Sequence, residues 1–147
     1  MRDARVDLRG LARSCLAEQG LNPALAEKAV EVVQAVTGSD IWRRAQASSR
    51  RLVEVPFQTL LPTNPETGDA VPTILRGVID LVFREDAGWV VVDYKTDAHS
   101  QKEVPQLVEH YRGQVQTYGT LWQETTGEPV AEKGLYFTHP GLYVEVK

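Results

Sequence analysis

The chain has 147 residues, one cysteine and a formal net charge of −4. A hydrophobic fraction of 42% and a charged fraction of 24% are ordinary for a globular protein, and they exclude a disordered, collagen-like or coiled-coil chain. The length predicts a single domain, residues 1–147, that needs no disulfide or structural metal to fold. Residues 1–53 hold nine Lys and Arg against six Asp and Glu, whereas residues 54–147 hold seven against fourteen. Because an acidic module binds duplex phosphates poorly, we expect any nucleic acid to be delivered by another component.

The cysteine content and the N-terminus bear on the cellular compartment. A single cysteine, Cys15, cannot form an internal disulfide, an all-cysteine zinc site or an iron–sulfur cluster. Since it lies among Leu11, Ala12 and Leu16, we expect a buried thiol in a reducing compartment. No apolar run of about 18 residues predicts a membrane span, and the charged start of the chain is unlike a secretory signal. We therefore expect a cytoplasmic protein that does not associate with membranes.

The first 50 residues have the periodicity of helices. A helix is predicted over residues 2–19, ending at Gly20, and Asn22 followed by Pro23 predicts the start of the next one. A stripe of apolar residues at helical spacing predicts that this second helix runs to Gly38. Its members are Leu25, Ala29, Val32, Val33 and Val36. A short helix is predicted over residues 41–47.

Beyond residue 50 the pattern changes to that of strands. Pro56 predicts that the first strand is at a sheet edge or contains a bulge. The predicted segments are strands at 52–60, 73–83 and 89–96, a loop at 62–69, a tight turn at 85–88, a long helix from 104 to about 126, and a hairpin with strands at 134–138 and 142–146. This order predicts an α/β or α+β domain with a mixed sheet, in which residues 1–50 are helical and residues 51–147 form the sheet and helix core.

Two acidic residues interrupt the apolar strands of the central hairpin. Side chains alternate along a strand, so Asp93 and Lys95 share one face, and Asp80 shares its face with Val78 and Val82. If the turn is a two- or four-residue loop centred on residues 86 and 87, Asp80 lies opposite Asp93. A three-residue loop would shift this pairing by one position.

Facing carboxylates need an explanation, because two like charges about 4 Å apart repel by roughly 4 kcal/mol at an effective dielectric constant of 20. Such a pair shares a proton, meets a cation or binds a divalent metal. Lys95 supplies one positive charge, and the remaining charge of −1 suits a hard ion such as Mg²⁺ or Mn²⁺. The alternative is an exposed Asp80 and a surface Asp93–Lys95 pair that contributes almost nothing to stability. The residues alone leave both open.

Five short stretches together resemble a known family. Gly77-Val78-Ile79-Asp80 and Asp93-Tyr94-Lys95-Thr96 resemble the paired motifs of the PD-(D/E)XK nuclease superfamily, most closely the C-terminal nuclease domain of RecB/AddA-type helicase–nucleases, which is related to the CRISPR-associated exonucleases. Glu54-Val55-Pro56-Phe57 resembles the Glu-x-Pro-Phe strand of that family, Tyr111-x-x-Gln114-x-x-x-Tyr118 its Gln-x-x-x-Tyr helix, and Leu135-Tyr136-Phe137 its closing strand. The resemblance covers about residues 20–147. It implies a restriction-endonuclease-like mixed sheet flanked by helices.

The resemblance implies roles for the residues of the central hairpin. Asp80, Asp93 and the backbone carbonyl of Tyr94 match the metal ligands of the family, with Mg²⁺ or Mn²⁺ as the cofactor. Lys95 matches its catalytic lysine, which positions or deprotonates the attacking water. Glu54 is either a further carboxylate near the metal or an exposed strand residue.

The same resemblance extends to the long helix. Gln114 and Tyr118 match residues that contact the nucleic-acid strand or orient the lysine, and Tyr111 shares their helix face. The alternatives are core packing for Tyr111 and Tyr118 and a solvated position for Gln114. We also expect Gly77 to permit a close backbone approach or a bulge, and Asp97 to be a turn residue rather than a ligand.

The function implied by the resemblance is that of a Mg²⁺-dependent deoxyribonuclease. It would act as an exonuclease on single-stranded DNA fed by a helicase domain of the same chain or complex, in double-strand-break repair and recombination. The family has a further metal-binding histidine on an upstream helix, whereas the N-terminal helices here contain no histidine and no helicase phosphate-binding loop is present. We therefore expect a fragment of a larger helicase–nuclease, incomplete in isolation. The alternative is a catalytically degenerate module used for DNA binding or protein docking.

Overall fold

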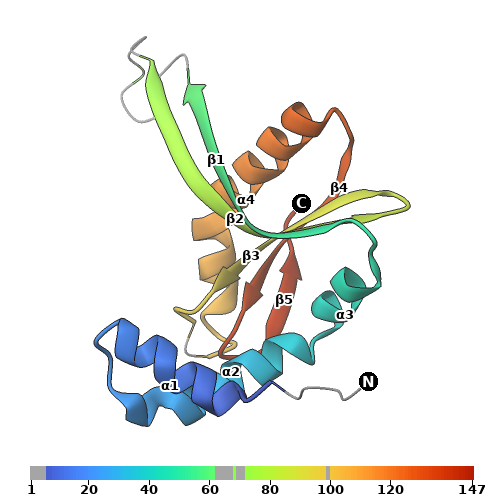
Figure 1. Ribbon diagram of the computed structural model, residues 1–147. Helices are drawn as coiled ribbons and strands as arrows, with labels where there is room; N and C mark the ends of the chain where they lie inside the picture. Colours follow the sequence, from blue (N-terminus) through green and yellow to red (C-terminus); the bar gives the residue numbers. More distant parts are fainter. Residues whose placement is uncertain (1–5, 62–67, 69–71, 99) are drawn as a thin grey trace. The chain divides into compact units, whose positions relative to one another are not determined.

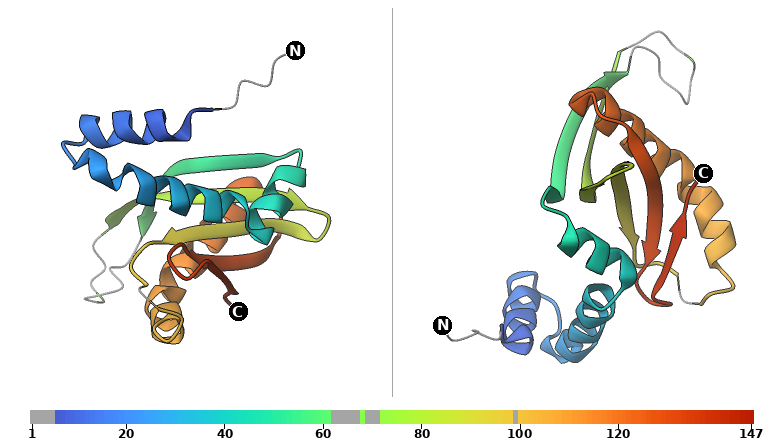
Figure 2. Two further views of the ribbon diagram at one scale, coloured as in Figure 1. Left: turned by 90° about the horizontal axis from the view of Figure 1, so that it is seen from below. Right: turned by 90° about the vertical axis from the view of Figure 1, so that its right-hand side faces the viewer.

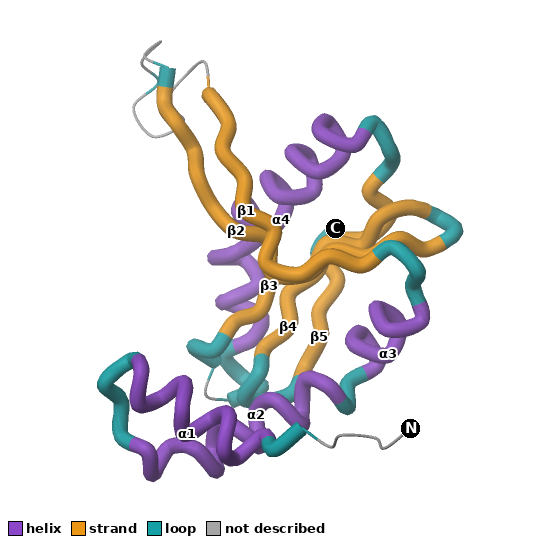
Figure 3. Tube along the Cα trace, in the orientation of Figure 1, coloured by secondary structure: helices purple, strands orange, loops and turns teal. Residues whose placement is uncertain are grey.

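The computed structural model describes residues 6–61, 68, 72–98 and 100–147, and the chain divides into two compact units, residues 1–43 and 44–147. Apart from residue 68, the loop predicted at 62–69 lies outside the described residues. Figure 3 shows the helices and strands along the chain.

The N-terminal unit is helical, as predicted. Helix α1 (Leu8–Glu18) is followed by the 3₁₀ turn η1 (Pro23–Leu25) and by α2 (Ala26–Thr37), and α3 (Asp40–Ala47) begins in this unit. Gly20 has a φ of +66°, in the left-handed region expected after a helix, and the Asn22 side chain accepts a hydrogen bond from the backbone N–H of Ala24. The signals at Gly20 and Asn22 are therefore confirmed. The predicted start of the first helix is wrong, because Val6 and Asp7 are not helical and α1 begins at Leu8, where Asp7 caps it.

The prediction that Cys15 is buried is wrong, and the apolar stripe of α2 is only partly covered. Cys15 is exposed. Although α1 packs along α2 within this unit, no residue of α1 is buried. The buried residues of α2 are Ala26 and Val30, whereas Leu25 and Val33 are about half exposed. The predicted stripe is thus covered only in part: Ala29, Val32 and Val36 are partly buried, whereas Leu25 and Val33 are exposed.

The C-terminal unit contains a five-stranded mixed sheet with one long helix (Figure 1). The strands, in spatial order, are β1 (Arg51–Leu61), β2 (Thr73–Glu85), β3 (Gly88–Lys95), β4 (Val130–Phe137) and β5 (Leu142–Glu145). All neighbours are antiparallel except β3 and β4, which are joined by the crossover helix α4 (Val104–Thr126). The mixed sheet and the edge position of β1, which carries Pro56, are confirmed.

Helix α4 covers one face of the sheet, as the right-hand view of Figure 2 shows. Its buried residues include Val108, Val115 and Trp122, and Gly127 ends the helix with a φ of +68°. Two groups of apolar side chains fill this layer. One joins the start of α4 to β4 through Leu135 and Phe137, and the other joins the end of α4 to β2 and β3.

Candidate active site

The register of the central hairpin brings the two predicted acids opposite each other. Glu85 pairs with Gly88, so the loop has two residues, and the pairing continues to Leu81 opposite Val92. Continued by one step, this register places Asp80 across from Asp93, although β2 and β3 are no longer paired there. The two-residue loop centred on residues 86 and 87 is therefore confirmed.

The alternation of side chains changes at Asp80, which corrects one prediction. Val82 and Ile79 both pack into the apolar group under α4, although strict alternation would separate them, and Val78 is about half exposed. Glu54, which falls opposite Asp80 in β1, has a φ of +50°, an uncommon value for a non-glycine residue. Both strands are strongly curved (Figure 1). The strict alternation predicted for this strand therefore fails between Ile79 and Val82, the segment that contains Asp80.

The backbone pairing of β2 with β3 stops at Leu81. Beyond this point the side chain of Asp80, rather than a backbone carbonyl of β2, accepts a hydrogen bond from β3. Its Oδ2 accepts a hydrogen bond of 2.7 Å from the backbone N–H of Tyr94. Burial raises the pKa of Asp80 above its ordinary value of 3.8, and the neighbouring Asp93 raises it further, whereas the Tyr94 N–H and Lys95 lower it. Two carboxylates therefore share this site, and one of them resists ionisation.

Asp93 and Lys95 form a buried ion pair on the same face. Asp93 Oδ2 lies 2.7 Å from Lys95 Nζ, and the two side chains are only 6% and 14% exposed. The same oxygen accepts no hydrogen bond of ordinary geometry. This pair is thus not the surface interaction considered as an alternative above.

Two side chains of α4 contact the lysine, and a third is hydrogen-bonded to one of them. Gln114 Oε1 accepts a hydrogen bond of 2.7 Å from Lys95 Nζ, and the Gln114 amide donates one of 2.8 Å to the hydroxyl of Tyr118. The ring of Tyr111 lies 3.9 Å from Lys95 Nζ, and its hydroxyl donates a 2.5 Å hydrogen bond to Asp97. Because Gln114 meets the lysine, it is not simply a solvated helix residue. Tyr118 both packs in the core and takes part in this cluster.

Gly77 allows the helix-facing side of β2 to approach its neighbours closely. A Cβ at this position would lie 2.6 Å from a ring atom of Phe57 and 3.5 Å from the hydroxyl of Tyr118. Phe57 is the cross-strand partner of Gly77, and its ring makes an edge contact with Tyr118. The close approach expected for Gly77 is confirmed: the Phe57 ring lies against it and contacts the Tyr118 ring.

The structure does not bring Glu54 into the same cluster. Glu54 is exposed, and among the described residues no group of three or more His, Cys, Asp or Glu side chains gathers. Two arginines that precede β1 form ion pairs away from this cluster. Arg44 pairs with Glu85 and Glu132, and Arg50 pairs with Glu128. These two arginines hold parts of the fold together.

The donor set fits a hard divalent cation. A buried carboxylate oxygen on Asp93 lacks an ordinary hydrogen-bond donor, and the pKa of Asp80 is raised beside it. Mg²⁺ is commonly held by only one or two carboxylates, with water completing its coordination. Two aspartates are therefore enough for such an ion without Glu54.

The comparison with protein families agrees with this geometry. The sequence profile of the PD-(D/E)XK nuclease superfamily matches residues 2–146. The chain belongs to this superfamily. The sheet with flanking helices is the α/β architecture expected of a restriction-endonuclease-like fold.

Relatives of this nuclease-superfamily chain carry one common name. An ATP-dependent helicase/nuclease subunit from Desulforamulus reducens is 32% identical over 115 residues, which are 74% of this chain and 9% of the relative. The protein of the same name from Oceanobacillus iheyensis is 34% identical over 121 residues, 76% of this chain and 9% of its own. That from Levilactobacillus brevis is 29% identical over an alignment 149 positions long, gaps included, which covers 95% of this chain and 12% of the relative. The chain thus spans about a tenth of the length of these relatives.

Two further observations concern membrane-spanning helices and Asp97. Within the described part of the chain, no helix combines the length and apolar character needed to cross a membrane. Asp97, expected only as a turn residue, is the hydrogen-bond partner of Tyr111. Fourteen positions separate the two, and no local spacing pattern signals the contact.

Proposed function

We propose that this chain is the nuclease portion of a helicase–nuclease and that it hydrolyses phosphodiester bonds in DNA with Mg²⁺ or Mn²⁺. We further propose exonuclease action on single strands that a helicase domain, in the same chain or complex, delivers during double-strand-break repair and recombination. Membership of the nuclease superfamily and the names of the relatives support the nuclease activity. The excess of acidic residues over basic ones in residues 54–147 supports the need for delivery.

One observation carries the proposal. Two carboxylates and one ammonium group from adjacent strands meet on the face covered by α4, and the ammonium group is held between Asp93 Oδ2 and Gln114 Oε1, each at 2.7 Å. Burying such charges is costly unless they are paired. An arrangement with two acids and one base therefore favours a site that takes up one more cation.

The roles follow from what each side chain can do. Asp80 and Asp93 would hold the metal ion, with the backbone carbonyl of Tyr94 as a further ligand. A bound divalent ion supplies Lewis-acid polarisation of the phosphoryl oxygen. Lys95, fixed close to both acids, would orient the attacking water, accept or release its proton and offset the negative charge that develops on the phosphate. Gln114 would keep the lysine at this position.

The test measures nucleotide release from single-stranded DNA labelled at either end, with Mn²⁺ present and with the chain joined to the upstream helix of the family that carries its metal-binding histidine. Asp80→Asn should remove cleavage, because it deletes a metal-binding charge. Asp86→Asn is the matched control, since Asp86 is exposed in the loop of the same hairpin. We expect cleavage by the wild type and by this control only, and the labelled end that shortens would give the polarity.

Calorimetric titration with Mn²⁺ separates this proposal from a degenerate module. We expect heat of binding for the wild type that is lost in Asp80→Asn. A wild-type chain that binds DNA but shows neither Mn²⁺ binding nor cleavage, even when joined to the helicase portion of a relative, would refute the nuclease proposal.

A further inference from the structure

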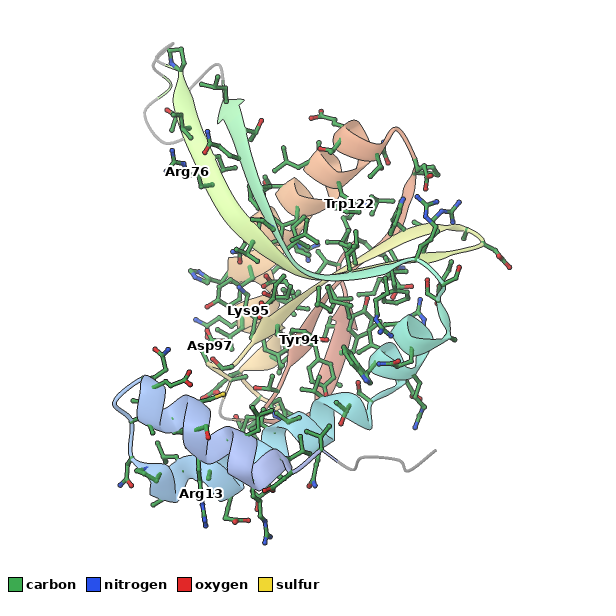
Figure 4. The ribbon with its side chains drawn as sticks, viewed as in Figure 1. Arg13, Arg76, Tyr94, Lys95, Asp97 and Trp122 are labelled. Carbon is green, nitrogen blue, oxygen red and sulfur yellow. The ribbon has the colours of Figure 1, made fainter. Side chains whose placement is uncertain are left out.

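Asp97 lies just beyond the end of β3, next to the lysine but outside the residues assigned above (Figure 4). Its Oδ2 accepts a 2.5 Å hydrogen bond from the hydroxyl of Tyr111. The ring of Tyr111 lies over Lys95, with 3.9 Å between the ring centroid and Nζ. A continuous set of contacts thus runs from Asp97 through Tyr111 to Lys95.

The ammonium group of Lys95 is contacted from three sides. Asp93 Oδ2 and Gln114 Oε1 take two directions, and the face of the Tyr111 ring takes the third. A cation close to an aromatic face is attracted by the ring quadrupole. The ring also blocks the path by which a flexible lysine would turn away from the two acids, because a lysine has several rotatable bonds.

Each helix-borne contact to Lys95 is oriented by a further group. Gln114 is oriented by its amide hydrogen bond to the Tyr118 hydroxyl. Tyr111 is partly buried against the apolar group at the start of α4, and the hydrogen bond to Asp97 fixes the hydroxyl end of its ring. Asp97 thus does for Tyr111 what Tyr118 does for Gln114.

The same contacts argue against Asp97 as a metal ligand. Its Oδ2 is engaged by the Tyr111 hydroxyl, and no third acidic side chain joins Asp80 and Asp93 in the described part of the chain.

We propose that Asp97 is a positioning residue that acts through Tyr111: its hydrogen bond holds the Tyr111 ring over Lys95 and so keeps the lysine beside the two acids. This inference rests on the proposed nuclease function, because the reaction is what the lysine position serves. It assigns Asp97 no contact with DNA or metal.

The test compares Asp97→Ala, Asp97→Asn, Tyr111→Phe and the control Asp86→Ala in the cleavage assay. Asp97→Ala and Tyr111→Phe should each lower kcat about fivefold, with KM, Mn²⁺ affinity and melting temperature unchanged. The double variant should be no worse than either single one, because both remove the same contact. Asp97→Asn should recover most of the activity, since an amide oxygen still accepts from the tyrosine hydroxyl. Asp86→Ala should behave as the wild type.

A second readout needs neither metal nor cleavage. Protons at the end of the Lys95 side chain should show an upfield ring-current shift in NMR spectra of the metal-free protein. Asp97→Ala should reduce this shift, and Tyr111→Leu should abolish it.

Each outcome decides between the two proposals. Unchanged kcat and unchanged Lys95 shifts in Asp97→Ala, in a wild type that cleaves DNA, would overturn the positioning role alone. Loss of Mn²⁺ affinity in Asp97→Ala would overturn it in favour of a metal ligand. A wild type that neither binds Mn²⁺ nor cleaves DNA when joined to the helicase portion of a relative, but whose Lys95 shifts respond to Asp97→Ala, would refute the nuclease function and keep the contact.

Discussion

We expect Lys95→Met to lower the free energy of unfolding of the metal-free protein. Added metal should restore much of that free energy. Lys95→Met keeps a side chain of similar length but removes the charge that faces Asp93. The two acids then lie in a largely buried site without a counter-ion. The resulting cost is the free energy of keeping an uncompensated carboxylate away from water.

The size of the effect follows from the burial of the pair. Breaking a buried ion pair costs about 3–5 kcal/mol. Because the lysine side chain is 14% exposed and that of Asp93 6%, we take the lower end, about 3 kcal/mol. For a domain of this size that corresponds to a fall of roughly 10 °C in melting temperature. Part of this cost disappears at low pH, since Asp80 already has a raised pKa and takes up a proton most readily.

The measurement is thermal unfolding in EDTA and in excess Mn²⁺, with Lys102→Met as the control because Lys102 is exposed. Mn²⁺ at about a hundred times its dissociation constant should return about 2.7 kcal/mol to the variant, whereas cleavage should stay at least about 100-fold below the wild type. A Lys95→Met protein that melts with the wild type in EDTA, or that gains nothing from Mn²⁺, would show that the lysine does not compensate the two acids.

Four other changes test separate parts of the site. Asp93→Asn should lose both Mn²⁺ binding and cleavage, and unchanged metal affinity by calorimetry would show that the ligand assignment is wrong. Gln114→Ala should lower kcat about tenfold but destabilise by less than about 1 kcal/mol, because the residue is exposed; equal losses would indicate a structural role. Gly77→Ala should destabilise by about 1–3 kcal/mol in urea unfolding, because its Cβ would overlap Phe57, whereas Gly113→Ala, in open space on α4, should stabilise by up to about 1 kcal/mol. If both alanines act alike, close packing at Gly77 is not the cause. Since the folded pKa of Asp80 is raised, stability of the metal-free protein should fall as pH rises from about 3.8 through that raised value, and Asp80→Asn should flatten this dependence.

Local patterns predicted most of the helices and strands, and they predicted facing acids on the condition of a two- or four-residue turn, which the structure meets. Glycine and asparagine signals located helix ends, and the two residues between Glu85 and Gly88 set the register that brings Asp80 opposite Asp93. These features depend on neighbours a few positions apart or on one tight turn. The pattern of alternation failed between Ile79 and Val82, in a curved strand beside an uncommon backbone conformation at Glu54.

The sequence by itself therefore determined that two aspartates and a lysine lie together on one hairpin, and the motifs around them indicated the family. Only the tertiary structure decided that Gln114 and Tyr111 reach Lys95, that Asp97 holds Tyr111, and that Cys15 is exposed. The physical reason is that periodicity reports which face a residue occupies on its own helix or strand. The contacts between α4 and the end of β3 depend on where and at what angle the crossover helix returns across the sheet, which no local pattern encodes.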